Sequence, residues 1–262
     1  MSAVLFLALV MIFAPVSFSA GEPSSVSLLS PNPVFQPGES LSYSISWSNI
    51  LTAGTAIMTV ENDTLPEGRN VLVFTATGHS QGLVELLYHV QDSARSVFDP
   101  LIRQSLSYNL QEMYGKKKRR HNLEFSTDRK SVTSKLNDDA PETFDVPERV
   151  LDTLSALYTI RLMDDFTIGK ITTINVFESE KIWSVEVQAL AKERVKTPAG
   201  EIDTIKIRTY PRYEGVYLNK GVAFLWLSDD FRKIPVLMKT SLKVGSFIFT
   251  LTDIRQGGEV HE

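Results

Sequence analysis

Residues 39–49, ESLSYSISWSN, decide the fold class of this chain. Every second residue in this stretch is a serine, and the residues between the serines are apolar: Leu41, Tyr43, Ile45 and Trp47. Alternation with a period of two is typical of a β-strand that buries one face and leaves the other to solvent. The stretch therefore predicts a half-buried strand.

Similar short apolar or alternating stretches continue along most of the chain. They lie at residues 55–61, 67–78, 94–99, 105–114, 121–126, 130–136, 170–178, 182–195, 201–210, 222–228, 233–242 and 245–254. The connections between many of them are short and contain the polar residues, Gly and Pro that favour turns. We therefore predict a mainly β protein whose antiparallel, strongly curved sheet forms a sandwich or an incomplete barrel.

One segment, residues 147–163, follows a different period. Its leucines recur at helical spacing and Pro147 suits a first helical turn, so we predict one principal helix there. We expect the leucine face to pack on the sheet and the opposite stripe to face water: Asp152, Ser155 and Thr159. The alternative is a lid over the mouth of a β cavity. A further helical turn near residues 83–87 stays open, because periodicity does not decide it.

The first twenty residues carry no charged side chain, and their apolar run is shorter than a membrane span. We therefore predict a signal peptide at residues 1–20, an irregular lead-in at 21–37, a single β-rich domain at 38–255 and a polar tail at 256–262. This organisation predicts a periplasmic or secreted protein that is not an integral membrane protein after signal cleavage. An uncleaved N-terminal anchor is the alternative.

Composition and missing motifs narrow the classes of function. The chain has 262 residues, a formal net charge of −4 and no cysteine. The negative charge gives no general attraction to nucleic acid, and the lack of cysteine excludes disulfides and thiolate metal sites. The sequence contains no metalloprotease helix motif, hydrolase nucleophile elbow or phosphate-binding loop, and its four histidines are not paired at metal-ligand spacing. We predict no catalytic residue, no cofactor-binding residue, no metal ligand and no cofactor.

Asp229 and Asp230 lie between two apolar strands and could be either a catalytic pair or a turn. Short polar side chains suit a hairpin corner, whereas a wet turn does not raise a carboxyl pKa as acid–base catalysis requires. We therefore interpret the pair as structural. Pro235, in the second strand, lacks an amide donor and is expected at a bulge or an edge position.

The strongest charge feature is the run GKKKRRH at residues 115–121. Its five consecutive cations are Lys116, Lys117, Lys118, Arg119 and Arg120. We expect them to project into solvent from the tip of a hairpin, because an extended chain would place cations on both faces. They either protect a sheet edge from pairing with other chains, or contact anionic lipid headgroups or an acidic envelope component.

Four stretches resemble, in content and order, the bacterial exported proteins grouped as domain of unknown function 3108 (DUF3108): residues 35–60, 151–163, 195–207 and 225–247. The resemblance covers nearly the whole predicted domain. It implies a periplasmic, β-rich protein of one domain. It implies no activity, because the family has no established catalytic residue to carry over.

These observations favour a non-enzymatic function. We predict an exported periplasmic binding or envelope-associated module that holds an apolar or amphipathic ligand, or a partner segment, on a concave β surface. One alternative is a structural partner protein that adds a strand to another envelope protein. Another is a hydrolase that acts on cell-wall sugars through paired acids.

Overall fold

A computed structural model describes residues 34–257, except residue 88 and residues 214–215, 218–221 and 243–244. The predicted signal peptide and most of the predicted lead-in lie outside the described residues, as do residues 258–262 of the predicted tail.

The described part of the chain folds into strands and two helices. The strands are β1 (Ser40–Trp47), β2 (Leu51–Thr64), β3 (Asn70–Ser80), β4 (Val90–Asp99), β5 (Gln104–Tyr114), β6 (Lys117–Phe125), β7 (Ser131–Leu136), β8 (Glu142–Asp145), β9 (Val150–Leu151), β10 (Ile171–Glu178), β11 (Lys181–Thr197), β12 (Gly200–Tyr213), β13 (Val216–Tyr217), β14 (Ala223–Ser228), β15 (Pro235–Leu242) and β16 (Gly245–Arg255). The helices are α1 (Gly82–Leu87) and α2 (Thr153–Arg161).

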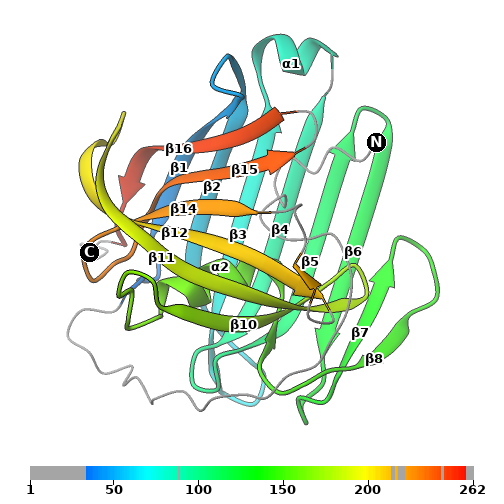
Figure 1. Ribbon diagram of the computed structural model, residues 1–262. Coiled ribbons are helices and arrows are strands. Elements are labelled where there is room, and N and C mark those ends of the chain that lie inside the picture. Colours follow the sequence, from blue (N-terminus) through cyan, green and yellow to red (C-terminus); the bar gives the residue numbers. More distant parts are fainter. Residues whose placement is uncertain (1–33, 88, 214–215, 218–221, 243–244, 258–262) are drawn as a thin grey trace, which may run out of the picture.

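All of the strands belong to one sheet. Its order is β8-β7-β6-β5-β4-β3-β2-β1-β16-β15-β14-β12-β11-β10-β9, with β13 beside β12. Neighbours are antiparallel except β9 and β10, which are parallel. Figure 1 shows β10 to β16 crossing in front of β2 to β6, with α2 between the two layers. The sheet curls over without closing into a barrel. The prediction of a mainly β protein, with a strongly curved antiparallel sheet that forms a sandwich or an incomplete barrel, is confirmed.

The alternating residues of β1 form part of the core between the layers. Leu41, Tyr43 and Ile45 are at most 1% exposed. Trp47 departs from the pattern and is 39% exposed, because it is the last residue of the strand before the turn to β2. Strand β1 pairs with β2 on one side and with β16 on the other, and it therefore joins the two halves of the sheet.

Helix α2 occupies the interior. It begins at Thr153 and not at Pro147, because Val150 and Leu151 form the short strand β9 beside β10. The expectation that its polar stripe faces water is wrong. Asp152 and Ser155 are fully buried, since the sheet curls around the helix and covers both of its faces.

Each predicted strand is present, and the open question at residues 83–87 resolves as α1. The sequence does not signal the short strands β8, β9 and β13. Of these, β8 lies in a polar segment that precedes the predicted helix, where an alternating apolar pattern is lacking. No helix in the described part of the chain has the length and apolar character of a membrane span.

Candidate functional site

Charged side chains meet in the interior where three neighbouring strands face α2 and β10. The sheet register places Asp92 of β4 opposite Glu112 of β5, and Glu112 opposite Arg119 of β6. All three lie on the inward face, and they are joined there by two further buried residues. We call this group the interior polar cluster: Asp92, Glu112, Arg119, His121 and Glu178.

Glu112 is fully engaged. Its carboxylate accepts a hydrogen bond from the Arg119 guanidinium at 2.8 Å and another from the Tyr114 hydroxyl at 2.6 Å. Glu112 is only 4% exposed, whereas the Arg119 side chain is 32% exposed, so the buried carboxylate is compensated by a half-buried cation.

Asp92 has no such compensation. It is 2% exposed, and no side chain donates a hydrogen bond to either carboxylate oxygen. The backbone amide of Met113 is the one donor that acts on it, and its effect on the pKa is smaller than that of burial. Burial, and secondly the negative charge of Glu112, raise the pKa of the Asp92 carboxyl to about 7. At neutral pH the group is therefore poised between a protonated form that can donate a hydrogen bond and an ionised form that can pair with a cation.

The two remaining members are also incompletely satisfied. Glu178 ends β10 in the opposite layer, where the charges of Arg119 and Glu112 act on it, and its Oε2 has no partner. His121 shares a 2.8 Å hydrogen bond between its Nε2 and the Ser134 hydroxyl, while its Nδ1 has none. Burial, and secondly the charge of Arg119, lower the pKa of His121 to about 4, so its ring is neutral at neutral pH.

The consecutive cations predicted as a surface feature divide between two environments. Lys116, Lys117 and Lys118 are exposed around the β5–β6 turn, as expected. Arg119 departs from the expected projection into solvent. It is half-buried and pairs with Glu112, because β6 has already begun and alternates its faces. Arg120 points outward and pairs with Asp138 at 2.8 Å.

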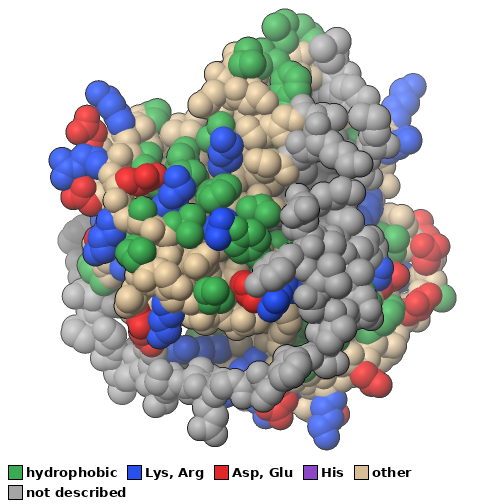
Figure 2. All heavy atoms as spheres, in the orientation of Figure 1, with side chains coloured by type: hydrophobic (Ala, Val, Ile, Leu, Met, Phe, Trp, Pro, Cys, Tyr) green, Lys and Arg blue, Asp and Glu red, His purple; other side chains and the backbone are tan. Residues whose placement is uncertain are grey.

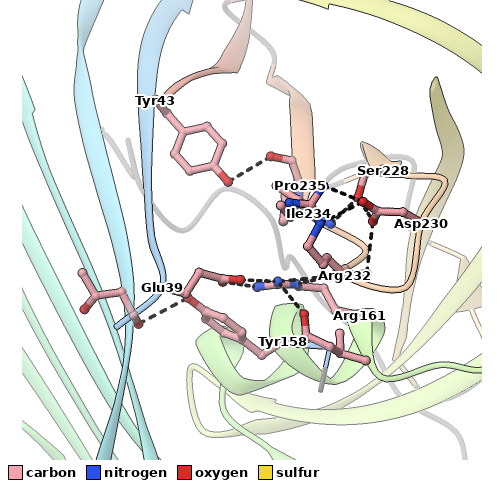
Figure 3. Close-up of polar contacts among 11 residues, drawn as sticks. Glu39, Tyr43, Tyr158, Arg161, Ser228, Asp230, Arg232, Ile234 and Pro235 are labelled. Carbon is pink, nitrogen blue, oxygen red and sulfur yellow. Dashed lines mark hydrogen bonds and ion pairs between the residues drawn. The ribbon is translucent and has the colours of Figure 1, made fainter. Parts of the chain in front are cut away.

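Asp229 and Asp230 are occupied by local contacts. Asp230 accepts hydrogen bonds from the Ser228 hydroxyl at 2.6 Å and from the Arg232 guanidinium, as Figure 3 shows. Asp229 pairs with Lys192 at 2.7 Å. Pro235 lies opposite Leu227 at a register shift, in agreement with the expected bulge. These contacts fit the structural interpretation of the pair.

Buried charge also fastens the C-terminal end of α2. Figure 3 shows Arg161 directed at Glu39, and its two terminal nitrogens donate to the Glu39 carboxylate at 2.7 and 2.9 Å. The same guanidinium donates to the Arg232 carbonyl at 3.1 Å and lies 5.3 Å from the centre of the Tyr158 ring. Because each of the three guanidinium nitrogens donates to a protein group, this site is structural.

The N-terminal end of α2 is fastened by Asp152. Its carboxylate accepts from the backbone amides of Leu154 and Ser155 at 2.9 Å, and from the Ser96 hydroxyl at 2.6 Å. The backbone amide of Asp152 donates a hydrogen bond to the Ser105 hydroxyl at 2.8 Å. Helix α2 is therefore held at both ends by buried polar contacts, which argues against a mobile lid.

A groove lies on the outer face of β3 to β6, away from the cluster, with a volume of about 320 Å³. Val97 and Leu106 contribute to its apolar floor. Of the two arginines that line it, Arg69 is paired at 2.8 Å with the buried Asp99. The groove therefore carries a less distinctive charge pattern than the interior polar cluster. No group of three or more metal-binding side chains was found among the residues that the structure describes.

The fold and the cluster define an open, curled all-β protein with an internal helix and buried charged groups. The chain belongs to the family described as "Protein of unknown function (DUF3108)", whose model matches residues 42–252. The resemblance found in the sequence is thereby confirmed. No curated protein matches the chain.

One solved structure shares the fold at low sequence identity, and two others match the chain with lower TM-scores. A Brucella abortus protein, described as a beta-barrel-like protein of domain of unknown function DUF1849, is 9% identical with a TM-score of 0.56, over 86% of this chain and 100% of that one. A candidate exported protein with a YmcC-like fold from Bacteroides fragilis is 11% identical with a TM-score of 0.36, over 86% and 98% of the two chains. A candidate lipoprotein from Parabacteroides distasonis is 9% identical with a TM-score of 0.35, over 85% and 98%. The first likeness shows the fold alone, and the other two carry no argument.

Proposed function

We propose that this protein is an exported, periplasmic binding module for an amphipathic molecule whose head group carries an amine or another hydrogen-bond donor. The proposal is carried by Asp92, the buried carboxyl group to which no side chain donates a hydrogen bond. Export is supported by the apolar, uncharged residues 1–20.

The energetic argument concerns the cost of an unpaired buried charge. Removing an ionised carboxylate from water costs several kcal/mol unless a counter-charge and hydrogen bonds replace its hydration. Glu112 obtains both from Arg119, whereas Asp92 has no counter-charge and no side-chain donor. A ligand amine or hydroxyl beside Asp92 would supply the missing partner, and the binding energy would come from relieving that cost.

The surroundings of Asp92 support an amphipathic ligand. On the same inward face, Val90 and Ala94 flank Asp92 along β4, and Leu110 lies opposite Ala94 on β5; each is 2% exposed. A ligand that reached Asp92 would therefore lie against apolar side chains, which suits a molecule with an apolar tail beside its polar head group.

Strand addition is less well supported. The edge strand β8 has four residues, and its outer edge carries the charges of Glu142 and Asp145, which discourage pairing with another chain. The shortness of that edge leaves few backbone groups for an added strand.

A hydrolase would use Asp92 and Glu112 as an acid–base pair, since their environments differ. However, the residues are 2% and 4% exposed, and Glu112 is held by Arg119 and Tyr114. A bulky sugar chain requires an open cleft beside its carboxyl groups, so burial favours the binding function.

The test is mass spectrometry of small molecules extracted from protein that has been purified from the periplasm. We expect the wild type to carry an amphipathic compound with an amine or hydroxyl group. Asp92→Ala should retain at least about tenfold less of it, because the ligand loses its buried polar partner.

The matched control is Asp139→Ala, which removes the same group from an exposed position. It should retain the wild-type amount of ligand. Wild-type protein that carries no such compound, or equal retention by a folded Asp92→Ala variant, would refute the proposal.

A further inference from the structure

We propose that one end of the molecule is a docking surface for an anionic phospholipid bilayer. The surface is formed where the β1–β2 turn, α1 and the β5–β6 turn meet. We call it the rim surface, and it consists of Trp47, Ile50, Leu83, Leu86 and the lysines 116–118. The inference goes beyond ligand binding and does not depend on it.

The apolar members of the rim surface are unusually exposed. Ile50 is 86% exposed, Leu83 61% and Leu86 82%. Figure 2 shows apolar side chains at the upper end of the molecule, where α1 lies in Figure 1. Large side chains left this open, close to one another and at one end, mark a contact site better than apolar residues scattered singly.

Hydrogen bonds hold the three connections together. The amide of Gln81, just before α1, donates to the Ala53 carbonyl of β2 at 2.9 Å. The amide of Gly115, in the β5–β6 turn, donates to the His89 carbonyl just after α1 at 2.7 Å. The lysines of the β5–β6 turn are therefore fixed beside the helix that carries Leu83 and Leu86.

The charge of the rim surface selects the partner. Lys116, Lys117 and Lys118 are exposed, and no acidic side chain pairs with them among the described residues. The nearby acid of α1, Glu85, is already bound by the Ser80 hydroxyl and the His89 ring. Unneutralised cations thus stand beside apolar side chains in a protein whose net charge is negative.

An anionic bilayer complements both properties at once. Its headgroups attract exposed lysines, and its interfacial region accepts aliphatic side chains. Trp47 fits the same place, because tryptophan concentrates at the membrane–water interface, and the Ile50 amide donates to its carbonyl at 3.0 Å. An acidic protein would satisfy the lysines but gives no reason for three highly exposed aliphatic residues around them.

The experiment is co-sedimentation of the purified protein with vesicles. Vesicles of phosphatidylglycerol and phosphatidylcholine are compared with vesicles of phosphatidylcholine alone, each at low and high salt. We expect binding to the anionic vesicles only, weakening by about tenfold or more at high salt, because exposed charges are screened over about 8 to 10 Å.

Two variants divide the surface by chemistry. The triple variant K116Q/K117Q/K118Q removes the charge, and I50S/L83S/L86S removes the apolar contact. Each should weaken binding to the anionic vesicles by about tenfold or more. Circular dichroism checks that both variants are folded, as the exposure of all six residues predicts.

Matched controls come from the same chain. L101S/I168S/I171S removes three aliphatic residues that are 50–71% exposed elsewhere, and K130Q/K135Q/K196Q removes three exposed lysines elsewhere. Both controls should bind within about twofold of the wild type. The proposal is overturned if the wild type does not bind anionic vesicles at low salt, or if the controls lose as much binding as the rim variants.

The proposals of ligand binding and of membrane docking can be refuted independently of each other. Loss of the extracted ligand in Asp92→Ala with normal vesicle binding would leave the docking surface intact. A wild type that carries a ligand but ignores anionic vesicles would overturn docking alone.

Discussion

At Asp92 the protein keeps a carboxyl group in its interior that no described residue neutralises, and the energetic cost depends on pH. The pKa is about 7 in the folded state and about 3.9 in an unfolded chain. Between these values the folded state holds a proton that the unfolded state releases. Stability should therefore fall as pH rises through this window and level off above the folded pKa.

His121 acts in the opposite sense. Its pKa is about 4 in the folded state and about 6.5 when unfolded, so its contribution rises with pH across that range. The two slopes partly cancel in the wild type, and only a variant separates them.

Asp92→Asn should become more stable relative to the wild type as pH rises from 4 to 8, by up to about 4 kcal/mol. The comparison isolates Asp92, because both proteins retain His121. Urea unfolding at the two pH values measures the difference, with Asp139→Asn as the surface control. A difference that does not change with pH would mean that Asp92 is already paired or solvated.

Part of the interior polar cluster can be read from the sequence. Asp92 shares the alternation of Ala94, Ser96 and Phe98, which marks it as inward-facing once β4 is extended by two residues. Glu112 and Arg119 follow from a hairpin that pairs Tyr114 with Lys117, since each step away from the turn pairs the next residues. The vicinity of Glu178 could not be read, because it depends on how two distant layers curl together.

At the scale of elements, α2 illustrates what periodicity contains and what it omits. The spacing of its leucines predicts a helix with one buried face. The opposite face is buried too, because Ser96 and Ser105 of the sheet supply partners for Asp152 and Ser155. Those serines lie about 50 residues earlier in the chain, and no local pattern reports on them.

Leu154→Ala tests whether α2 is packed between the two layers of the sheet. Leu154 is 7% exposed. Its truncation should lower the free energy of unfolding by about 2 to 5 kcal/mol, because it leaves a cavity that the two layers of the sheet cannot close. Ile168→Ala, at a position that is 50% exposed, should change stability by about 0.5 kcal/mol or less. Equal denaturation midpoints for Leu154→Ala and the wild type would show that the helix is not packed as described.

At the scale of the whole molecule, β1 connects the two halves of the sheet. It has hydrogen-bonded neighbours on both sides and a core-facing row at most 1% exposed. Strand β8 stands at the other extreme, as a four-residue edge strand with exposed side chains. Local sequence patterns do not predict which strand lies in the middle of the sheet and which lies at its edge. The order of the strands depends on pairings between distant parts of the chain.

Hydrogen exchange should distinguish the central strand from the edge strand. Amides of residues 41–47 should exchange only through global unfolding, whereas those of residues 142–145 should exchange through local opening, at rates faster by about a hundredfold or more. Mass spectrometry of the corresponding peptides measures both in one sample, so each is the reference for the other. Similar protection of the two peptides would contradict the sheet order.

The pairing of β1 with β16 also has a consequence for how the protein is made. A ribosome completes β1 more than 190 residues before it completes β16, since Ser46 pairs with Ile248. Until β16 has been synthesised, one edge of β1 has no hydrogen-bonded neighbour, and the two halves of the sheet cannot pair. The nascent chain therefore cannot reach its final fold until synthesis is nearly finished, and this delay is compatible with the export proposed above.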